Sequence, residues 1–570
     1  MEWVRNTAKQ IREKWKSYDP PDNLETKQEY KQRWRSIYIV YFTMFSISLG
    51  FSIIVTGVWP YLDRLDPLAG KEFMGYVVAA NPLAQMIFSP LVGWWSNKLG
   101  SIRIPIVISI IIFGVSSAMY SSIELVTDNR KYWMLASRFF VGLSSANVAI
   151  CRSYLAAATR YSERTGAVSM ISLAQVIGFI LGPAIQACVV PLGNDGFWVI
   201  QDKLKIDMYT ACGWISVLIA IINLYMFLPT IFIEHKIAGR EAMLKQKKDN
   251  IKDTYKLHKP NYFATWTLIV AFFVIVFNFM LLETLATPLT MDQFGWSKSQ
   301  SLKYTGILIS VGALISIGTS VAIPQLSKYF SEVKIMVWGG FFFMALGRAI
   351  YIPYNNDPPP IYDNDLKLNL TFFCDRTFRN SSFNPTNFNV SELSILNVNF
   401  SSFSDFLEVN KTEDLIKSAT FNCGDDLVGC PSTQTWCAEL PALTITNFVI
   451  GLLLTTFGYP LGITLIQTLV SKHLGTRPQG VWMGLLTGAG CLSRVLGPVC
   501  VTHIYEGYGT IWTFGLTSAM MVVSLIWLIY FEKEITPVEI VAMDEESQEL
   551  KDVCLNKEKE DQKIDVNEKF

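Results

Sequence analysis

Charged side chains are scarce in this chain, and histidine is scarcer still. Asp, Glu, Lys and Arg together make up 17% of the 570 residues, and there are four histidines. Hydrophobic residues account for 51% and aromatic residues for 13%, a balance that a soluble globular protein of this length rarely shows. The charges that do occur are concentrated at the two ends and in a few loops. The composition therefore indicates an integral membrane protein.

Motifs of common enzyme classes are also missing. The sequence has no P-loop, no glycine-rich dinucleotide turn and no Cys/His set with metal-ligand spacing. Its formal charge balances at 48 acidic against 48 basic residues, and this balance by itself says nothing about partners. We therefore expect a protein that is not an enzyme and has no cofactor, no metal site and no nucleic-acid partner. Its expected partners are membrane lipid and a small solute.

Long apolar stretches recur along the chain. A helix needs roughly 20 apolar residues to cross a hydrocarbon core of about 30 Å, and twelve stretches of about that length can be counted. We predict an all-α integral membrane protein with twelve transmembrane helices. The expected parts are a cytosolic N-terminal segment 1–35, a six-helix half 36–233, a cytosolic linker 234–262, a second six-helix half 263–531 and a disordered cytosolic tail 532–570.

One segment carries all of the N-glycosylation sequons, and its position orients the protein. Glycan transfer takes place on the lumenal side of the secretory system, so residues 354–440, between spans nine and ten, are predicted to be lumenal. Basic residues agree, with nine in 1–35 and eight in 234–261, because Lys and Arg favour the cytosolic side. Both termini are expected in the cytosol. The acceptor residues are Asn369, Asn380, Asn389, Asn399 and Asn410.

Four cysteines lie in the same segment, namely Cys374, Cys423, Cys430 and Cys437. The lumen is oxidising, so these residues are disulfide candidates. Four cysteines permit three pairings, and the sequence does not choose among them. We expect this large glycosylated loop to be a disulfide-held cover against lumenal proteases.

The two sets of six spans resemble duplicated halves. Pro183 of span five and Pro498 of span eleven are 315 residues apart, whereas Pro60 and Pro288, near the ends of spans one and seven, are 228 apart. The difference of 87 equals the length of the segment 354–440. A duplicated six-span unit with one insertion explains both spacings, and such repeats are common in secondary transporters.

The loop after span two resembles the signature of the major facilitator superfamily, G-x-x-x-D-[RK]-x-G-x-[RK]-[RK]. The matching residues are Gly93, Asn97, Lys98, Gly100 and Arg103. Asn97 stands where the family usually has an acid. The resemblance implies that this loop latches one conformation, and an uncharged Asn97 implies a weaker or different latch.

Small residues at four-residue spacing add two further similarities to that family. Arg138-x-x-x-Gly142-x-x-x-Ala146 lies in span four and Gly178-x-x-x-Gly182-Pro183 in span five, while span eleven carries Gly497-Pro498 at the matching position. Residues of this kind allow close helix packing in membranes. The packing candidates are Gly142, Gly178, Gly182, Pro183, Gly497 and Pro498.

Longer stretches resemble the lysosomal major facilitator proteins of the neuronal ceroid lipofuscinosis group. They include Val58-Trp-Pro-Tyr-Leu, Glu283-Thr-Leu-Ala-Thr-Pro and Pro478-Gln-Gly-Val-Trp-Met-Gly. That group implies a glycoprotein of the lysosomal or late endosomal membrane, which is either a carrier of small solutes or a chloride-permeable channel. Its members carry an acidic dileucine signal, which neither tail of this chain shows. A plasma-membrane location therefore stays open.

Ionisable residues inside spans are costly and are functional candidates by default. Arg494 lies about 21 Å into span eleven at 1.5 Å per residue, Glu283 lies in span seven and Arg138 in span four. In a major facilitator fold, spans four and seven line the central cavity, so Arg138 and Glu283 are expected to face each other and to allow proton coupling. Two arginines with one carboxylate make the cavity net positive, which favours an anionic solute.

Purely structural roles stay open for several of these residues. Arg138 and Arg152 can snorkel to the surface, Glu283 can mark only the rim of the cavity, and Arg348 is expected to be structural. The rival function is a non-transporting scaffold or receptor that uses the glycosylated loop. A monomer is expected, and a dimer stays open.

Overall fold

The computed structural model describes residues 24–537, apart from residues 56, 67–69, 127, 194–195, 201–203, 246–260, 355–356, 363–428, 432–433 and 476. Within that part of the chain, the regular structure is helical except for two short strand pairs. The predicted all-α class is confirmed. All five sequons, together with Cys374 and Cys423, lie outside the described residues.

The N-terminal half begins earlier than the sequence indicated, because the first helix starts at Lys27 rather than near Ser36. A short helix, α3, continues it after a break at Gly57. Span four is divided at Ala146 into α6 and α7. The helices are α2 (Lys27–Val55), α3 (Val58–Leu65), α4 (Gly70–Leu99), α5 (Arg103–Ser121), α6 (Arg130–Ser145), α7 (Asn147–Ala158), α8 (Tyr161–Val189) and α9 (Thr210–Met226).

The C-terminal half ends in a helix of 51 residues that is broken once. Gly509 has φ 81° and ψ −167°, outside the helical region. A positive φ is readily adopted by glycine, so the chain reverses there and α21 contains two spans. The helices are α12 (Tyr262–Phe294), α13 (Lys298–Leu326), α14 (Glu332–Lys334), the π-helix η3 (Ile335–Phe342), α15 (Phe343–Ile350), α20 (Ile445–Leu474) and α21 (Gly480–Tyr530).

Ten helices in the described part of the chain are long and apolar enough to cross a membrane. The shorter apolar helix α9 adds one more, and the division of α21 at Gly509 adds another. By length and composition alone, the described residues therefore hold ten to twelve candidate spans, and the sequence predicts twelve.

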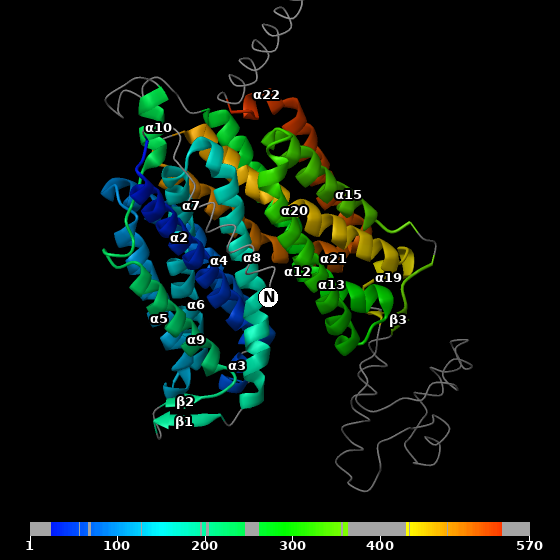
Figure 1. Cartoon of the computed structure of the whole chain (residues 1–570). Coiled ribbons are helices and arrows are strands. Elements are labelled where there is room, and N and C mark those ends of the chain that lie inside the picture. The colour runs from blue at the N-terminus through cyan, green and yellow to red at the C-terminus, as the bar shows by residue number, and fades with distance from the viewer. Residues whose placement is uncertain are drawn as a thin grey trace, which may run out of the picture.

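The helices form two groups side by side, with α2 to α9 in one and α12 to α21 in the other (Figure 1). The end where α10 (Ile237–Lys245) and α22 (Glu532–Ile535) lie is called the α10 end below. The opposite end, called the strand end, carries β1 (Phe197–Ile200) paired with β2 (Leu204–Ile206), and β3. The two groups meet toward the α10 end and spread apart toward the strand end (Figure 1).

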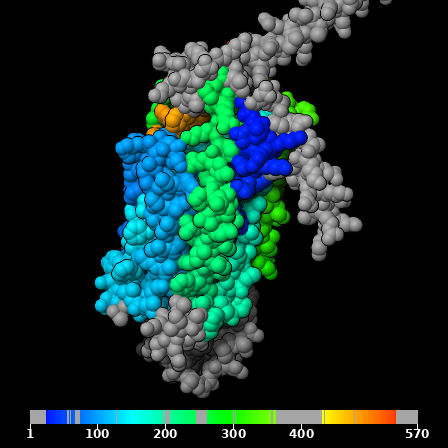
Figure 2. Space-filling view, turned by 60° about the vertical axis from the view of Figure 1, so that its left-hand side comes forward, coloured from blue at the N-terminus to red at the C-terminus, as the bar shows by residue number. Residues whose placement is uncertain are grey.

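Apolar side chains cover the outer face of the N-terminal half. Figure 2 shows this face, with α5 and α9 side by side and α2 next to them. On these helices Val115 is 64% exposed and Ile221 is 59% exposed. Large apolar side chains on the outside of a helical bundle match contact with hydrocarbon rather than water.

Glycines allow close helix packing within the first half. A Cβ atom on Gly178 would lie 2.6 Å from the Phe45 carbonyl oxygen, and one on Gly182 would meet the hydroxyl of Ser52, so both bring α8 against α2. Gly142 packs in the same way on the Asn81 backbone of α4. In the second half, a Cβ atom on Gly497 would lie 3.1 Å from the Cβ of Met280. Pro183 and Pro498 lie inside α8 and α21.

The two ends of the inserted segment 354–440 meet at the strand end. β3 (Ile361–Tyr362) pairs in parallel with β4 (Cys430–Pro431), and the Ala442 amide donates to the Asp357 carbonyl at 2.7 Å. An insertion that leaves and returns at one point need not disturb the helices around it. Cys430 and Cys437 form a disulfide. Of the three pairings that the sequence leaves open, the structure therefore has the one that joins these two residues.

Candidate functional site

The two halves touch closely at the α10 end, where α4 meets the start of α21. The backbones of Gly93 and Gly480 are so close that a Cβ atom on either would overlap the other. The Asn97 side-chain oxygen accepts a hydrogen bond from the Gly480 amide at 3.0 Å. Asn97 thus satisfies one of the unpaired amides at the start of α21. The uncharged residue of the signature loop is a helix cap that joins the two halves.

A second set of contacts joins the start of α8 to the ends of α20 and α14. The Thr165 hydroxyl donates to the Glu332 carboxylate, which also pairs with Lys472 at 2.7 Å. The Lys472 ammonium lies 4.4 Å from the centre of the Tyr161 ring, and Arg164 donates to the Ser471 carbonyl at 3.2 Å. Thr165, Glu332 and Lys472 are nearly inaccessible to solvent. We call these residues the α10-end latch.

At the strand end, the polar contacts between described residues that surround the helix ends join residues of the same half. Arg64 pairs with Asp207 at 2.8 Å in the first half. In the second, the Tyr505 hydroxyl donates to Asp292 at 3.0 Å, and Trp436 donates to the Glu506 carbonyl at 3.2 Å. This arrangement matches the spread of the helices in Figure 1.

Between the two ends, Glu283 and Arg494 lie close together in the space between the halves. The Glu283 side chain is exposed to solvent, and it lies near enough to Arg494 for the two charges to interact. The Arg494 guanidinium lies 5.9 Å from the centre of the Phe179 ring on α8. Arg494 therefore extends from the second half toward the first. Tyr459 of α20 lies near enough to Arg494 for the two side chains to interact.

Arg152 of α7 completes this group from the first half. It is 7% exposed, and it donates to the Thr487 hydroxyl of α21 at 3.2 Å and to Gln175 of α8 at 3.3 Å. Its Nε has no partner among the described residues. Its positive charge and that of Arg494 repel each other. Thr487 precedes Arg494 by seven residues, or about 10 Å along the helix. Arg152, which is bonded to Thr487, therefore lies nearer the α10 end than Arg494 does.

Arg152, Glu283, Tyr459 and Arg494 are called the midplane site below. It holds two guanidinium groups from opposite halves and one carboxylate, so its formal charge is +1. Unpaired buried donors carry a large desolvation cost. A bound anion would satisfy the free Arg152 donor and balance the charge.

The structure does not bring Arg138 to this site. Arg138 is 3% exposed and lies 5.8 Å from the ring of Tyr120 on α5, within the first half. Glu283 is grouped with Arg494 instead of Arg138. Arg152 lies 14 residues after Arg138, about 21 Å further along the span at 1.5 Å per residue, and there it reaches α21. The sequence favours a surface anchor for Arg152, and no local signal points to its partner Thr487, 335 residues away in the sequence.

Other predicted residues have local structural contacts. Gly100 has φ 64°, in the left-handed region, at the turn after α4. Lys98 lies 5.2 Å from the Trp94 ring centre. The Arg103 amide donates to Glu234 at 2.9 Å and its Nε to the Phe227 carbonyl at 3.0 Å, so the loop is tied to the segment before α10. Arg348 is fully buried within the second half, where it donates to the Asn278 carbonyl.

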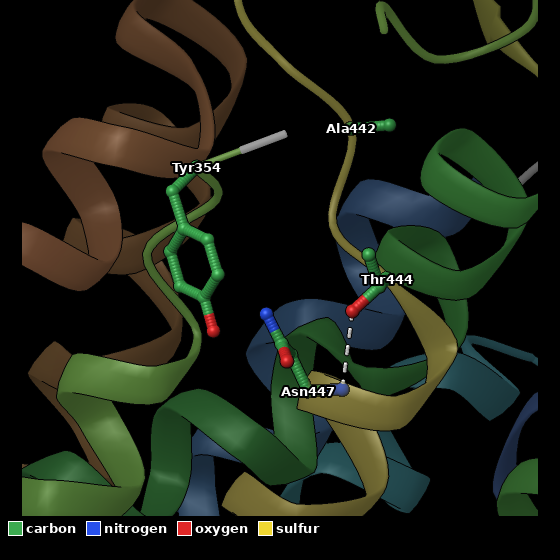
Figure 3. Close-up of a pocket in the computed structure, with 4 residues that line it drawn as sticks. All are labelled: Tyr354, Ala442, Thr444 and Asn447. Carbon is green, nitrogen blue, oxygen red and sulfur yellow. Dashed lines mark hydrogen bonds between the residues drawn. The ribbon is translucent and has the colours of Figure 1, made fainter. Parts of the chain in front are cut away.

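A shallow pocket at the strand end is separate from the midplane site. Its lining residues are Tyr354, Ala442, Thr444 and Asn447, and the Asn447 amide group points toward the Tyr354 hydroxyl (Figure 3). Asn447 precedes Tyr459 by twelve residues, or about 18 Å along α20. The polar residues at the start of span ten therefore do not line the midplane site.

Comparison with known proteins supports a membrane transporter fold. Residues 40–369 match the family model of the Major Facilitator Superfamily. The chain is 35% identical to the Major facilitator superfamily domain-containing protein 8 of Xenopus laevis over 90% of this chain and 94% of that protein. It is 29% identical to the Quinolone resistance protein NorA of Staphylococcus aureus (strain COL) over 57% of this chain and 74% of that protein.

Solved structures resemble the chain at low sequence identity. The proton:xylose symporter XylE has a TM-score of 0.58 at 11% identity, covering 88% of this chain and 96% of its own. A bacterial homologue of the iron transporter ferroportin in the outward-facing state has a TM-score of 0.55 at 10% identity, covering 87% and 99%. Together with the family match, these confirm the predicted two-half fold.

Proposed function

The chain belongs to the major facilitator superfamily, and from that premise we propose that it moves a small anion across a membrane by alternating access. The observation that carries the proposal is the midplane site, where Arg152 and Arg494 come from opposite halves and one carboxylate, Glu283, lies near Arg494. An anion bound between the two arginines holds the halves together through its charge. Binding can therefore favour closure of the strand end, which is the step that alternating access requires.

Glu283 gives the site a means of coupling to protons. It and the anion compete for the same partner, Arg494. When the anion occupies Arg494, the carboxylate loses its counter-charge and a proton can take its place. Proton-coupled anion movement is the form of transport that this pairing supports.

We place the α10 end in the cytosol and the strand end in the lumen of late endosomes or lysosomes. Three features support this placement: the basic residues of 1–35 and 234–261, the sequons within 354–440, and the resemblance to lysosomal relatives. The structure then corresponds to a lumen-facing state. A channel reading is less well supported, because the α10-end latch interrupts the path between the halves.

Flux measurements on the purified full-length chain in vesicles test the proposal. Arg152→Gln and Arg494→Gln are each expected to reduce anion flux at least tenfold, since about 1.4 kcal/mol corresponds to a factor of ten and charged hydrogen bonds contribute about that much or more. Lys328→Gln is the matched control, because Lys328 is exposed in the loop after α13. Its flux should equal that of the unmodified chain.

The scaffold reading makes the opposite prediction. If the protein does not transport, neutralising Glu283 or Arg494 leaves its cellular function intact, whereas deletion of residues 363–428 abolishes it. Unchanged anion flux in both arginine variants, with folded protein in the vesicles, would refute the transport proposal.

A further inference from the structure

Aromatic rings from both halves surround the charged groups of the midplane site. In the first half, Phe51 of α2 and Phe179 of α8 form an edge-to-face pair with ring centres 5.8 Å apart. In the second half, Phe279 of α12 and Tyr459 of α20 are stacked at 4.0 Å with an interplanar angle of 18°. All four residues remain partly exposed to solvent. The four rings are called the aromatic walls below.

The aromatic walls adjoin the charges on each side. Phe179 lies under the Arg494 guanidinium at 5.9 Å. Phe279 precedes Glu283 by four residues, so the two lie on the same face of α12, one turn apart. Tyr459, stacked on Phe279, lies near Arg494, Glu283 and Arg152. A ligand held by the arginines would therefore contact ring surfaces of both halves.

A simple inorganic anion would gain little from these walls. The face of an aromatic ring carries the negative part of its quadrupole, so it does not attract a bare anion. The rings instead favour a flat apolar group, which is transferred from water to an apolar surface at roughly 25 cal/mol per Å² of area. Packing alone does not explain why all four rings beside the charged groups stay partly exposed, because close packing would bury them.

Arg152 supplies a second, independent indication of a ligand. Its side chain is more than nine-tenths buried, two of its nitrogens are held by Thr487 and Gln175, and its Nε has no partner among the described residues. Such a guanidinium is preorganised for an oxyanion, since arginine binds carboxylate-like groups through a planar fork of donors.

Resting on the proposed function, we propose that the substrate is an amphiphilic organic anion that joins one oxyanion group to a flat apolar body. The oxyanion lies between Arg152 and Arg494, and the flat body lies between the Phe279–Tyr459 pair and the Phe51–Phe179 pair. The same ligand then contacts both halves through both its charge and its apolar part. Closure of the strand end around it brings the aromatic walls together.

A series of sulfonates tests this substrate class, because their charge is permanent and they do not cross the lipid as neutral acids. Uptake of methanesulfonate, benzenesulfonate and naphthalenesulfonate is measured in vesicles that contain the full chain, with chloride flux measured in parallel. The apparent affinity should rise at least tenfold from methanesulfonate to naphthalenesulfonate, following the apolar area buried. Phe279→Leu should reduce this ratio severalfold, whereas Phe330→Leu, at an exposed position of the α10 end, should leave the ratio unchanged.

The outcomes separate this inference from the proposed function. Equal affinities across the series, or chloride flux that depends on Arg494 with no sulfonate uptake, overturn the substrate class and leave anion transport standing. A ratio that persists in Phe279→Leu and in Phe179→Leu shows that the walls do not contact the ligand and also overturns it. If the unmodified chain moves neither chloride nor any sulfonate, or if Arg494→Gln leaves every flux unchanged, the proposed function itself is overturned.

Discussion

The α10 end and the strand end of this molecule use the same kinds of side chains in opposite ways. At the α10 end, Glu332 and Asn97 bond across the boundary between the halves. At the strand end, Asp207 and Asp292 bond to residues of their own half. Contacts across the boundary stabilise one relative position of the halves, whereas contacts within a half leave that position free. The comparison shows which end is closed and which contacts must break when the protein changes state.

The largest effect is expected from a steric wedge at the α10 end. In Gly93→Val, the added side chain would overlap the Gly480 backbone, so the closed α10 end cannot form without movement of a helix. The variant should favour the state that is open at the α10 end. Spin labels at Leu99 and Tyr329, exposed in opposite halves at this end, should move apart.

Gly75→Val is a suitable control for that wedge, because no atom lies within 4 Å of a Cβ atom at Gly75 of the same helix. It should leave the label distance unchanged. An unaltered distance in Gly93→Val as well would mean that the Gly93–Gly480 contact does not hold this end closed.

The next effect concerns the α10-end latch. Glu332→Gln removes the ion pair with Lys472 and weakens the bond from Thr165. Breaking a buried pair leaves an uncompensated charge and costs about 3–5 kcal/mol in soluble proteins, part of which appears in the balance between states. The same spin labels should show a larger open population.

Restoring the pattern with a second substitution separates charge from packing. Glu332→Gln with Lys472→Gln leaves no unpaired charge, so its open population should fall below that of Glu332→Gln alone. If the double variant opens as far as the single one, the charge of Lys472 is not what destabilises the closed state.

A smaller shift in the other direction is expected from Asn97→Asp. Asn97 accepts from the amide at the start of α21, and a negative charge at a helix N-terminus is stabilising by about 0.3–1 kcal/mol. The closed α10 end should gain up to about fivefold in population, and anion exchange should slow. Asn97→Ala, which removes the acceptor, should act oppositely; two variants that shift the population in the same direction would exclude capping as the cause.

At the strand end, Trp436→Phe should change stability and not the balance between states. The variant loses the hydrogen bond to the Glu506 carbonyl, worth about 0.5–1.5 kcal/mol, but keeps a ring against Tyr505, whose ring centre is 5.2 Å away. The melting temperature should fall while the label distances stay as they are. A shift in those distances would show that strand-end contacts also control the state.

The smallest effect concerns pH at the α10 end. Burial lowers the pKa of His235, between α9 and α10, below its ordinary value of 6.5. As pH falls through 6.5, the unfolded chain binds a proton before the folded chain does, so stability decreases. Between pH 7.5 and 5.5, the melting temperature of His235→Gln should fall less than that of the unmodified protein. An equal or larger fall would show that His235 does not contribute.

The spans were predictable because a helix needs about 20 apolar residues to cross a bilayer, and such a run is visible within one continuous stretch of sequence. The start of α2 at Lys27 was not. Residues 27–35 include five charged side chains and therefore resemble a solvated segment before the first span. Arg33 is nevertheless fully buried, and it pairs with Glu25 at 2.8 Å and with Glu163 of α8 at 2.9 Å. Partners distant in the sequence decide whether such a segment is surface or core.

The candidate site was partly predictable for the same reason. Glu283 and Arg494 are charges deep in apolar spans, so their cost alone marks them. Arg152 and Arg138 share one span, and their roles are separated by contacts with Thr487 and Tyr120, which lie on other helices. The capping role of Asn97 likewise depends on a partner 383 residues away in the sequence.

Distances between spin labels at both ends, measured in vesicles with and without a transported anion, test the central claim most directly. One pair joins Leu99 and Tyr329 at the α10 end, and the other joins Leu192 and Tyr508 at the strand end, all at exposed positions. Without anion, the α10-end pair should be close and the strand-end pair apart. Anion should bring the strand-end pair together in the unmodified chain and not in Arg152→Gln. Label distances that do not respond to any anion, or that respond equally in Arg152→Gln, would contradict the account.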